Sequence, residues 1–482
     1  MKPAALMLFG AAISAALAGA QEIPTPALPK DFVRLGKISP RHARHVKGSN
    51  WSVGAETMGR GYTVYKHWRA YLGPLGVKSA RIQSGWARTE QKKGVYDWAW
   101  LDEIIPDMVN QGVKPWVCLC YGNPIYAGGG TASGSNKLKL PSSPEALEAW
   151  DNFVRAFVQR YAKYVDEWEI WNEPQHKKSN SVPDYAEFVI RTAEIIRAEQ
   201  PHAKIFALSA SGKSLKDSIF KGFLKIMKRK GKLDLVNALT FHPYNANPDS
   251  SYKEIKRLQA TVSAFSKDIT LFQGENGAPS TRRTQGGLSG RSWTEISQAK
   301  WLLRRLLGDL GRNIRSSYFS IVDMHYIRGG KLLMNTKGLI STNRDKTVKR
   351  PKLSYRAYQN ITAVFDNTLH RLPNVAPPRK PADLVMFAYE TAPGKNHAAQ
   401  SIVCVWRGGE MPSNKLRMSP VSFTVPNSGL EEPVYVDMLS GYVYAFSNKR
   451  ISRRDGKIAF KDIPIGDWPV LIADRHALGR SL

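Results

Sequence analysis

The sequence predicts an α/β protein in which a (β/α)8 TIM barrel precedes a C-terminal β-sandwich domain. First, apolar strand-like runs alternate eight times with amphipathic helical runs between residues 49 and 368, the pattern of βα units around a parallel sheet. Second, no G-x-G-x-x-G follows the first run, and eight repeats favour a closed barrel over an open doubly wound sheet. Third, short alternating runs separated by Gly, Pro and Asn begin near residue 369, which is typical of a small sandwich.

The length of the chain agrees with this division into domains. A chain of 482 residues, 42% of them hydrophobic, is long enough for two or three domains with their own cores. We expect the barrel at 49–368 and the sandwich at 369–482, with the proline-rich segment 374–383 near its entry. Residues 21–48 are basic and lack a clear period, so we assign them to an N-terminal arm that can dock onto the sandwich.

The first 20 residues have the pattern of a secretory signal peptide. One Lys precedes an apolar run, and Ala18-Gly19-Ala20 forms a small-x-small cleavage sequence before Gln21. An uncleaved anchor is the alternative, but the run is short for a bilayer span. We therefore expect a secreted or periplasmic protein with no membrane contact after cleavage.

Eight segments are expected to form the barrel strands, with helices between them. The stretches 143–165 and 296–311 repeat apolar residues every three and four positions, as amphipathic helices do. The expected strands cover residues 50–56, 79–86, 115–122, 167–173, 204–211, 238–245, 269–276 and 316–326.

Neither cysteines nor histidines form a metal-binding pattern in the sequence. Three cysteines are few for an exported protein, so disulfides are not expected to be its main stabilising element. Cys118 and Cys120 alternate within one strand, as small buried residues would. The ten histidines show no H-E-x-x-H or similar spacing, and we expect neither a metal site nor a cofactor.

Two glutamates follow buried strands at positions where a barrel places its functional groups. Glu173 precedes Pro174, which lacks an N–H and ends strand pairing, and Glu275 follows the apolar run 269–272. Both are therefore expected at the carboxyl ends of strands, the face of the barrel that carries active sites. Glu169 lies about 13 Å deeper and is expected to pair with an interior arginine. The alternative for Glu173 is a solvated side chain in a strand-to-loop turn.

A pair of carboxylates at one end of a barrel suits glycoside chemistry. One carboxyl group protonates the leaving oxygen, and the second attacks the anomeric carbon or activates a water. The two strands lie well apart around the barrel, but side chains at their ends can converge over its opening. A non-catalytic glycan-binding barrel is the alternative, and it would be expected to lack one carboxylate.

Four motifs in the expected order resemble those of the clan A glycoside hydrolases, retaining (β/α)8 enzymes, nearest to families 39 and 5. The motifs are "WNEP" at 171–174, "FHPY" at 241–244, "GEN" at 274–276 and Arg81 within "SARIQSGW". The resemblance covers about residues 49–326.

The resemblance implies a role for three side chains. Glu275 would be the nucleophile and Glu173 the acid/base, so that the anomeric configuration is retained. Asn172 would donate a hydrogen bond to the sugar 2-hydroxyl, an interaction that strengthens in the transition state.

The resemblance also implies a set of supporting residues. Arg81 and Tyr244 would hold Glu275 ionised and oriented, because a nearby cation and a hydroxyl donor both favour the carboxylate. His242 would face the site near Glu173, although an ordinary core histidine is the alternative. Many clan members carry a tryptophan at the end of strand eight, where this chain has the segment 323–326, "DMHY". The sugar that binds there is therefore expected to be unusual.

Aromatic side chains near the barrel opening are candidates for stacking on a sugar ring. Most tryptophans of a barrel belong to its core. We expect stacking from Trp86 and Trp293, since each follows a strand in a polar loop.

The charge of the chain suggests an anionic substrate. The formal net charge is +30. The lysines within residues 221–232 contribute to it and have the spacing of a solvated helix face. Four loops expected at the barrel opening, here called the mouth loops, contain 14 Lys or Arg against one acid, Asp345, where the chain-wide ratio would give about eight acids. Such an opening attracts polyanions. The mouth loops are residues 121–143, 174–182, 276–293 and 327–350.

The predicted function is thus a secreted retaining glycoside hydrolase acting on a polysaccharide or oligosaccharide. Arg282 and Arg283, just after the nucleophile strand, favour an anionic glycan such as a carrageenan- or agar-type galactan or a uronate-containing chain. A neutral β-glycan, such as a xylan, mannan or glucan, is the alternative. Nucleic acid is not expected as a partner, because charge alone favours it and no recognition module accompanies the charge.

Overall fold

The computed structural model describes most of the chain. It covers residues 25–56, 58–132, 139–175, 180–212, 216–328, 330–373, 375–378, 381–393, 398–427 and 429–481. The expected signal peptide at 1–20 lies outside these residues, as do Lys137, Lys177 and Lys178 of the mouth loops. Within the part of the chain described, no helix combines the length and apolar character that a membrane span requires.

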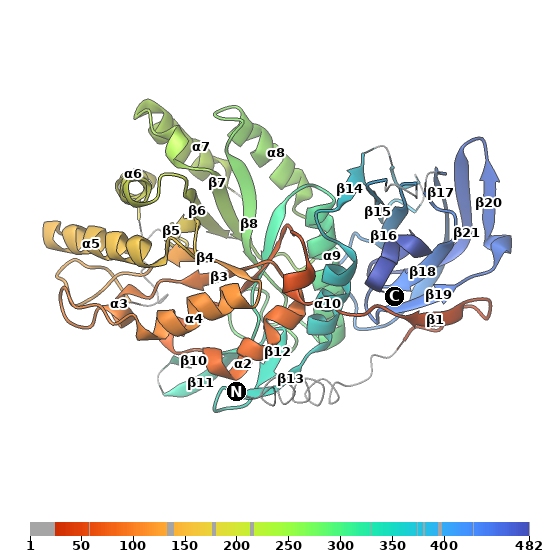
Figure 1. Cartoon of the computed structure of the whole chain (residues 1–482), viewed down its shortest axis with the longest axis horizontal. Coiled ribbons are helices and arrows are strands. Elements are labelled where there is room, and N and C mark those ends of the chain that lie inside the picture. Colours follow the sequence, from red (N-terminus) through yellow and green to blue (C-terminus); the bar gives the residue numbers. More distant parts are fainter. Residues whose placement is uncertain are drawn as a thin grey trace, which may run out of the picture.

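The barrel that the sequence predicts is present and closed (Figure 1). Its parallel strands follow one another in chain order, and the last pairs with the first through Trp51 and Ser316. Each of the eight expected strand segments overlaps a barrel strand, which confirms the predicted fold class. The strands are β2 (Trp51–Gly54), β3 (Ser79–Gln83), β4 (Lys114–Leu119), β5 (Glu167–Ile170), β6 (Lys204–Gly212), β7 (Ala238–Pro243), β8 (Thr270–Asn276) and β9 (Arg315–Tyr318).

Amphipathic helices cover the outside of the barrel. In α5, the Ser143 side chain accepts the first free N–H, from Ala146, and Trp150, Phe153 and Phe157 repeat every three or four residues on the buried face. The helices are α2 (Tyr65–Trp68), α3 (Trp86–Thr89), α4 (Ala99–Asn110), α5 (Pro144–Tyr161), α6 (Val182–Glu199), α7 (Asp217–Arg229), α8 (Tyr252–Ser263), α9 (Glu295–Leu310) and α10 (Leu353–Val364).

The last barrel strand is shorter than the sequence predicts. We expected it to run to Tyr326, but β9 ends at Tyr318, and the remainder of the apolar run enters a hairpin beside the barrel. Asp323, at the start of that remainder, is buried and accepts a hydrogen bond from Lys352 Nζ at 2.7 Å. The added strands are β10 (Met324–Arg328), β11 (Lys331–Asn335), β12 (Ile340–Thr342) and β13 (Val348–Pro351).

The C-terminal domain is built from a seven-stranded and a three-stranded antiparallel sheet, consistent with a sandwich. Phe423 and Phe460 of the smaller sheet and Val403 and Ile472 of the larger one share its core. The sheet orders are β1-β19-β18-β22-β16-β15-β14 and β17-β21-β20, where β1 is Val33–Lys37, β14 Leu369–Leu372, β15 Leu384–Thr391, β16 Ser401–Arg407, β17 Met418–Pro426, β18 Pro433–Asp437, β19 Tyr442–Ala445, β20 Ile451–Arg454, β21 Lys457–Gly466 and β22 Val470–Asp474.

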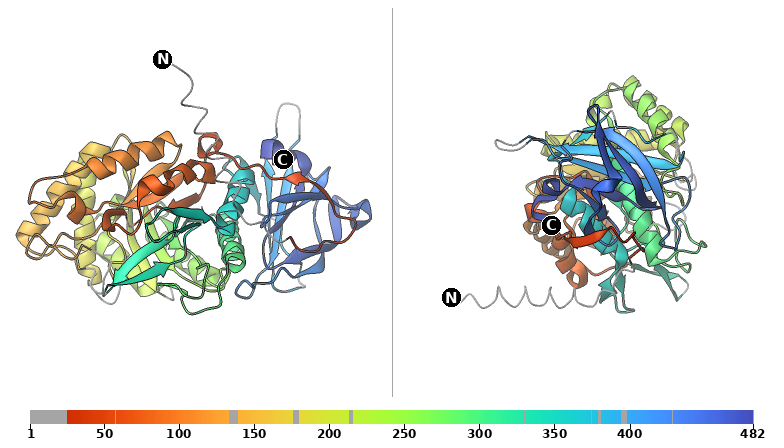
Figure 2. Two further views of the ribbon diagram at one scale, coloured as in Figure 1. Left: turned by 90° about the horizontal axis from the view of Figure 1, so that it is seen from below. Right: turned by 90° about the vertical axis from the view of Figure 1, so that its right-hand side faces the viewer.

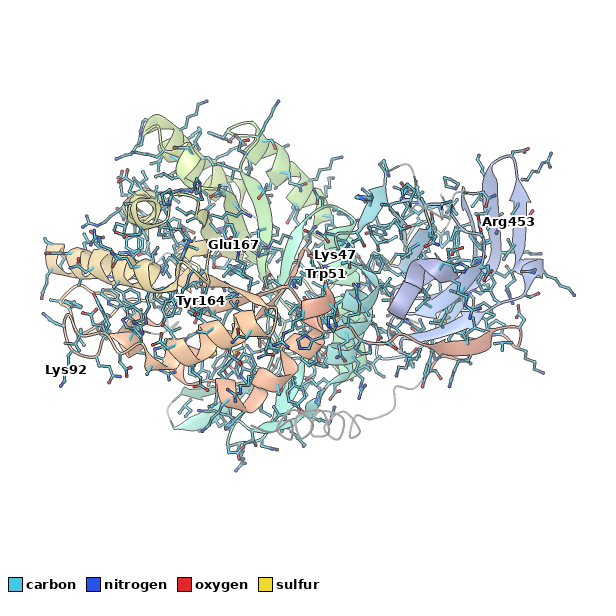
Figure 3. All side chains as sticks on the ribbon, viewed as in Figure 1. Lys47, Trp51, Lys92, Tyr164, Glu167 and Arg453 are labelled. Carbon is cyan, nitrogen blue, oxygen red and sulfur yellow. The ribbon has the colours of Figure 1, made fainter. Side chains whose placement is uncertain are left out.

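The N-terminal arm and two helices connect the domains. Strand β1, within the expected arm, pairs with β19 at the edge of the larger sheet (Figure 2). Helices α9 and α10 lie between barrel and sandwich (Figure 1), and Lys300 of α9 forms a 2.5 Å ion pair with Asp467. Figure 3 labels Trp51 and Glu167, which begin β2 and β5 and so mark the end of the barrel opposite its carboxyl-terminal face.

Candidate active site

The two glutamates singled out in the sequence lie together at the carboxyl-terminal face of the barrel. Glu173 follows β5 and Glu275 is part of β8. One carboxylate oxygen of each and one ring nitrogen of His242 all lie within 4.8 Å of one another. Glu275 is 9% exposed and the Glu173 side chain is 19% exposed. Both carboxyl groups are therefore partly shielded from water, but a ligand can reach them from the carboxyl-terminal face of the barrel.

The backbone around Glu173 is held in an uncommon conformation. Trp171 and Glu173 have φ values of 66° and 50°, the left-handed region that non-glycine residues rarely adopt. Ser209 Oγ accepts a hydrogen bond from the Glu173 N–H at 3.1 Å and donates one to the Trp171 carbonyl at 2.9 Å. Ser209 lies where the register of β6 is irregular, a feature that often redirects side chains near active sites.

Both carboxylate oxygens of Glu275 receive hydrogen bonds. Arg81 Nη1 donates to Oε2 at 3.2 Å, and the Tyr244 hydroxyl donates to Oε1 at 2.5 Å. A cation and a hydroxyl donor both stabilise the ionised form of a carboxyl group. Glycine precedes Glu275 because a Cβ on Gly274 would lie 2.9 Å from His242 Nε2. The local sequence "GEN" thus lets the imidazole approach the strand.

Arg81 is the centre of this network and is fully buried. Its Nε donates to Glu169 at 2.8 Å, and its Nη2 donates to Asn172 Oδ1 at 2.8 Å. Its Nη1 lies 3.1 Å from Glu56 and 3.2 Å from Glu275. The expectation that Glu169 pairs with an interior arginine is confirmed. A single guanidinium therefore contacts three carboxyl groups and the Asn172 amide.

Glu56 is a member of this network that the sequence analysis missed. It lies two residues after the end of β2 and is 3% exposed. Burial raises its pKa to about 8, against the opposing effect of Arg81. Glu56 is therefore protonated at neutral pH, and the charge of Arg81 remains available to Glu169 and Glu275. An acid at the end of the first apolar run was the signal in the sequence, and the same signal identified Glu173 and Glu275.

His242 and Asn172 both face the two glutamates. His242 Nδ1 lies 3.4 Å from Glu173 Oε1 and 3.8 Å from Glu275 Oε2. Burial lowers the pKa of His242 to about 4, so the ring is neutral at ordinary pH. We expected His242 either to face the site or to be an ordinary core histidine, and it does both: it is buried and faces the two glutamates. Asn172 Nδ2 donates to the Tyr121 hydroxyl at 2.8 Å, which fixes the orientation of the amide.

The three clustered groups could in principle also bind a metal ion. Glu173, His242 and Glu275 have suitable atoms at suitable mutual distances. Both Glu275 oxygens, however, already accept hydrogen bonds from Arg81 and Tyr244. A pair of carboxyl groups set in different surroundings accounts for the cluster without an ion.

The structure corrects the expectation for the two tryptophans. Trp86 is fully buried, and its ring lies nearly parallel to those of Tyr126 and Phe153, each 5.8 Å away. Trp293 is 3% exposed and donates its Nε1–H to the Leu288 carbonyl. Neither side chain is exposed, although Trp86 belongs to the lining of a cavity at the barrel opening. Trp86 begins α3 instead of standing in a loop, and its side chain turns into the core.

Tyrosines at the barrel opening offer aromatic surface in their place. Tyr62 and Tyr326 are both partly exposed, and their ring centroids lie 4.9 Å apart. The guanidinium of Arg60 lies 4.9 Å from the Tyr62 ring centroid and 5.2 Å from that of Tyr121. No sequence pattern pointed to Arg60 or Tyr62, because the loop after the first strand carries no motif.

The basic residues of the mouth loops occupy several kinds of environment. Arg282 and Arg283 are exposed, as expected of residues that attract an anion. Arg350 already forms a 2.5 Å ion pair with Glu295, an acid outside the mouth loops. Lys337 is buried, and burial lowers its pKa to about 7. The residue count therefore overstates the charge that is free at the opening.

Comparisons with known proteins agree with the fold and with the enzyme class. Residues 81–267 match the family model described as glycosyl hydrolases family 39, a stretch that includes Arg81, Glu173 and Tyr244 but ends before Glu275. No curated protein matches the sequence.

Solved structures share the fold at low sequence identity. A family 39 glycoside hydrolase from Bacteroides cellulosilyticus has a TM-score of 0.63 at 15% identity, over 89% of this chain and 81% of that one. A monomeric β-xylosidase from Caulobacter crescentus has a TM-score of 0.58 at 16% identity, over 92% and 97%. A glycoside hydrolase family 30 subfamily 8 xylanase from Clostridium acetobutylicum has a TM-score of 0.57 at 15% identity, over 91% and 97%.

The family model matches part of the barrel, the fold is shared with solved glycoside hydrolases, and two carboxyl groups lie together at the carboxyl-terminal face. The chain is a glycoside hydrolase that resembles the retaining (β/α)8 enzymes of clan A.

Proposed function

We propose that the enzyme cleaves an anionic glycan with retention of configuration, with Glu275 as nucleophile and Glu173 as acid/base. The observation that carries the mechanism is the short distance between the two carboxyl groups, whose nearest oxygens lie within 4.8 Å. Retaining enzymes place these groups about 5–5.5 Å apart, whereas inverting enzymes separate them by about 6.5–9.5 Å to admit a water.

The surroundings of the two groups suit their different roles. Glu275 is held by hydrogen bonds from Arg81 and Tyr244 and forms a bond to the anomeric carbon as the glycosidic C–O bond breaks. Glu173 Oε1 lies 3.4 Å from His242 Nδ1; Glu173 gives its proton to the leaving oxygen and later takes one from water. That water displaces Glu275 and releases the sugar. Asn172 uses one amide N–H for Tyr121, which leaves the second for the sugar 2-hydroxyl.

The charge near the site supports an anionic substrate. Arg282 and Arg283 lie in the loop after β8 and are exposed, and the net charge is +30. Sulfated galactans of carrageenan or agar type and uronate-containing chains both fit this charge. The signal-like residues 1–20 support a secreted or periplasmic enzyme that meets such polymers outside the cytoplasm.

A neutral β-glycan is the second candidate substrate. Two of the similar structures are named as a β-xylosidase and a xylanase. Acid depletion at the opening does not by itself place a charge beside the reacting sugar.

Two measurements test the proposal. NMR of the first-formed product should show the configuration of the substrate, and an inverted product would contradict the assigned roles. A screen of neutral, uronic and sulfated polysaccharides at low and high salt should show salt-sensitive cleavage of an anionic polymer. Efficient, salt-insensitive cleavage of neutral glycans alone would reject the substrate class and leave the catalytic pair intact.

A further inference from the structure

A cavity of about 340 Å³ opens at the carboxyl-terminal face of the barrel. Its wall includes Arg60, Tyr62, Gln83 and Tyr121, from the loops and ends of the first three barrel strands. We propose that this cavity is a sugar subsite adjoining the reaction centre, and that Arg60 binds a carboxylate or sulfate carried by the sugar. The inference rests on the proposed function and names one residue responsible for selecting anionic glycans.

The cavity adjoins the reaction centre through shared residues. Tyr121 contributes to the cavity wall and accepts a hydrogen bond from Asn172, which immediately precedes Glu173. Gln83, at the end of β3, lies two residues after Arg81 on the same strand. A sugar in the cavity would therefore neighbour the one whose bond is broken. The volume is near the lower end of the range for small-molecule sites, about 300–1,000 Å³, and suits a single ring.

Arg60 is oriented by its neighbours, but its charge is not balanced by them. Nη2 donates to Gln83 Oε1 at 3.1 Å, and the guanidinium lies over the Tyr62 and Tyr121 rings. The Nε–H is buried and has no hydrogen-bond partner. Among the residues that the structure describes, no carboxylate lies within ion-pair distance of Arg60.

A guanidinium in this state is a suitable receptor for an oxyanion. Buried donors normally find a partner, and those that lack one call for an explanation. The planar fork of an arginine binds carboxylate or sulfate oxygens through two parallel hydrogen bonds. Because Gln83 and the two tyrosines already restrict the side chain, binding loses little of its rotational freedom. The partly exposed ring of Tyr62 adds a surface for the sugar itself.

Matched substrates separate this role from a structural one. The first pair is a sulfated galactan oligosaccharide and its chemically desulfated product; the second is an oligouronide and its carboxyl-reduced product. The test variant is Arg60→Met. The control variant is Arg229→Met, which removes an exposed arginine at the end of α7, away from the barrel opening. The readouts are kcat and KM on each substrate and the midpoint of thermal unfolding.

We expect Arg60→Met to lower kcat/KM on the anionic member of one pair roughly 10- to 100-fold, mainly through KM, because a charge-assisted hydrogen bond is lost. The neutral member should change by no more than about twofold, and Arg229→Met should affect neither. A selective loss on the sulfated galactan would show that Arg60 binds a sulfate, and a selective loss on the oligouronide would show that it binds a carboxylate. Arg60→Lys should recover part of the loss, since it keeps the charge without the fork.

Several outcomes would overturn the inference without affecting the proposed catalytic pair. Equal losses on both members of a pair would assign Arg60 a structural role, and wild-type kinetics in Arg60→Met would remove it from binding. If the wild type cleaved only neutral glycans, the anionic substrate class and the subsite would both be rejected. Where turnover is slow, calorimetric titration of the same oligosaccharides into Glu275→Gln, with and without Arg60→Met, gives the same comparison.

Discussion

The side chains around Arg81 and those on the rim of the barrel opening differ in how firmly their neighbours hold them. Arg81 is fully buried, and its guanidinium contacts three carboxyl groups. Arg282 and Arg283 on the rim are exposed. Buried charges interact strongly and in fixed geometry, whereas exposed ones are screened and mobile. The inner network is therefore suited to chemistry, and the rim to attraction of a substrate.

Replacing Glu275 by Gln is the strongest test of the inner network. The variant keeps the shape of the side chain but removes the charge that Arg81 and Tyr244 stabilise. We expect kcat to fall on the order of 10⁴-fold or more on every substrate, because the nucleophile is lost. Initial rates on an aryl glycoside measure this, and near-wild-type rates on any substrate would reject the assignment.

Replacing Glu173 by Ala should have a smaller and more selective effect. Loss of a general acid costs roughly 10²- to 10⁴-fold in rate, but leaving groups that need no proton are affected least. Activated aryl glycosides should thus be cleaved faster than natural linkages, and added azide should restore turnover. As a control, Glu169→Gln, deep in the network, should alter stability more than the leaving-group dependence. An identical loss on all leaving groups would contradict the acid role.

Sequence patterns predicted the inner network better than the rim because strand ends impose geometry. Glu173 and Glu275 each follow a buried apolar run, and parallel strands of a barrel bring their carboxyl ends together. Periodicity does not show where a chain leaves the sheet, so the end of β9 at Tyr318 was missed. Nor does it show which way a side chain turns after a strand, and for that reason Trp86 was expected to expose its ring and Arg60 was not singled out.

Replacing Glu56 by Gln tests the network around Arg81 through the pH dependence of the free energy of unfolding. The folded-state pKa of about 8 exceeds the ordinary value of 4.5, so the stability from protonated Glu56 is complete below pH 4.5. This stability is lost as pH rises to 8. Between these pH values Glu56 is ionised in the unfolded state but still protonated in the folded state, so a rise in pH favours unfolding. Relative to the wild type, the permanently neutral variant should gain on the order of 3–5 kcal/mol in free energy of unfolding between pH 4.5 and 8.

Urea unfolding at several pH values measures this difference. Parallel stability curves for Glu56→Gln and the wild type would mean that Glu56 is ionised in the folded protein. His242 acts in the opposite sense: its pKa of about 4 lies below the ordinary 6.5, so its contribution to stability is present above pH 6.5 and lost as pH falls through 4. The His242 and Glu56 effects therefore have opposite slopes and can be told apart by the Glu56 variant.

The smallest effect is expected on the rim, from a double variant with Arg282→Gln and Arg283→Gln. Both side chains are exposed, so they should raise the local concentration of a polyanion without touching the reacting sugar. We expect KM for an anionic polysaccharide to rise only about 3- to 10-fold at low salt, with kcat unchanged. The difference should disappear near 1 M salt, where the screening length is about 3 Å.

The matched control, Lys228→Gln with Arg229→Gln, removes two adjacent exposed charges at the end of α7. An equal rise in KM for that control would assign the attraction to net charge instead of the rim, and a salt-independent loss in the rim variant would mean that Arg282 or Arg283 binds the substrate directly.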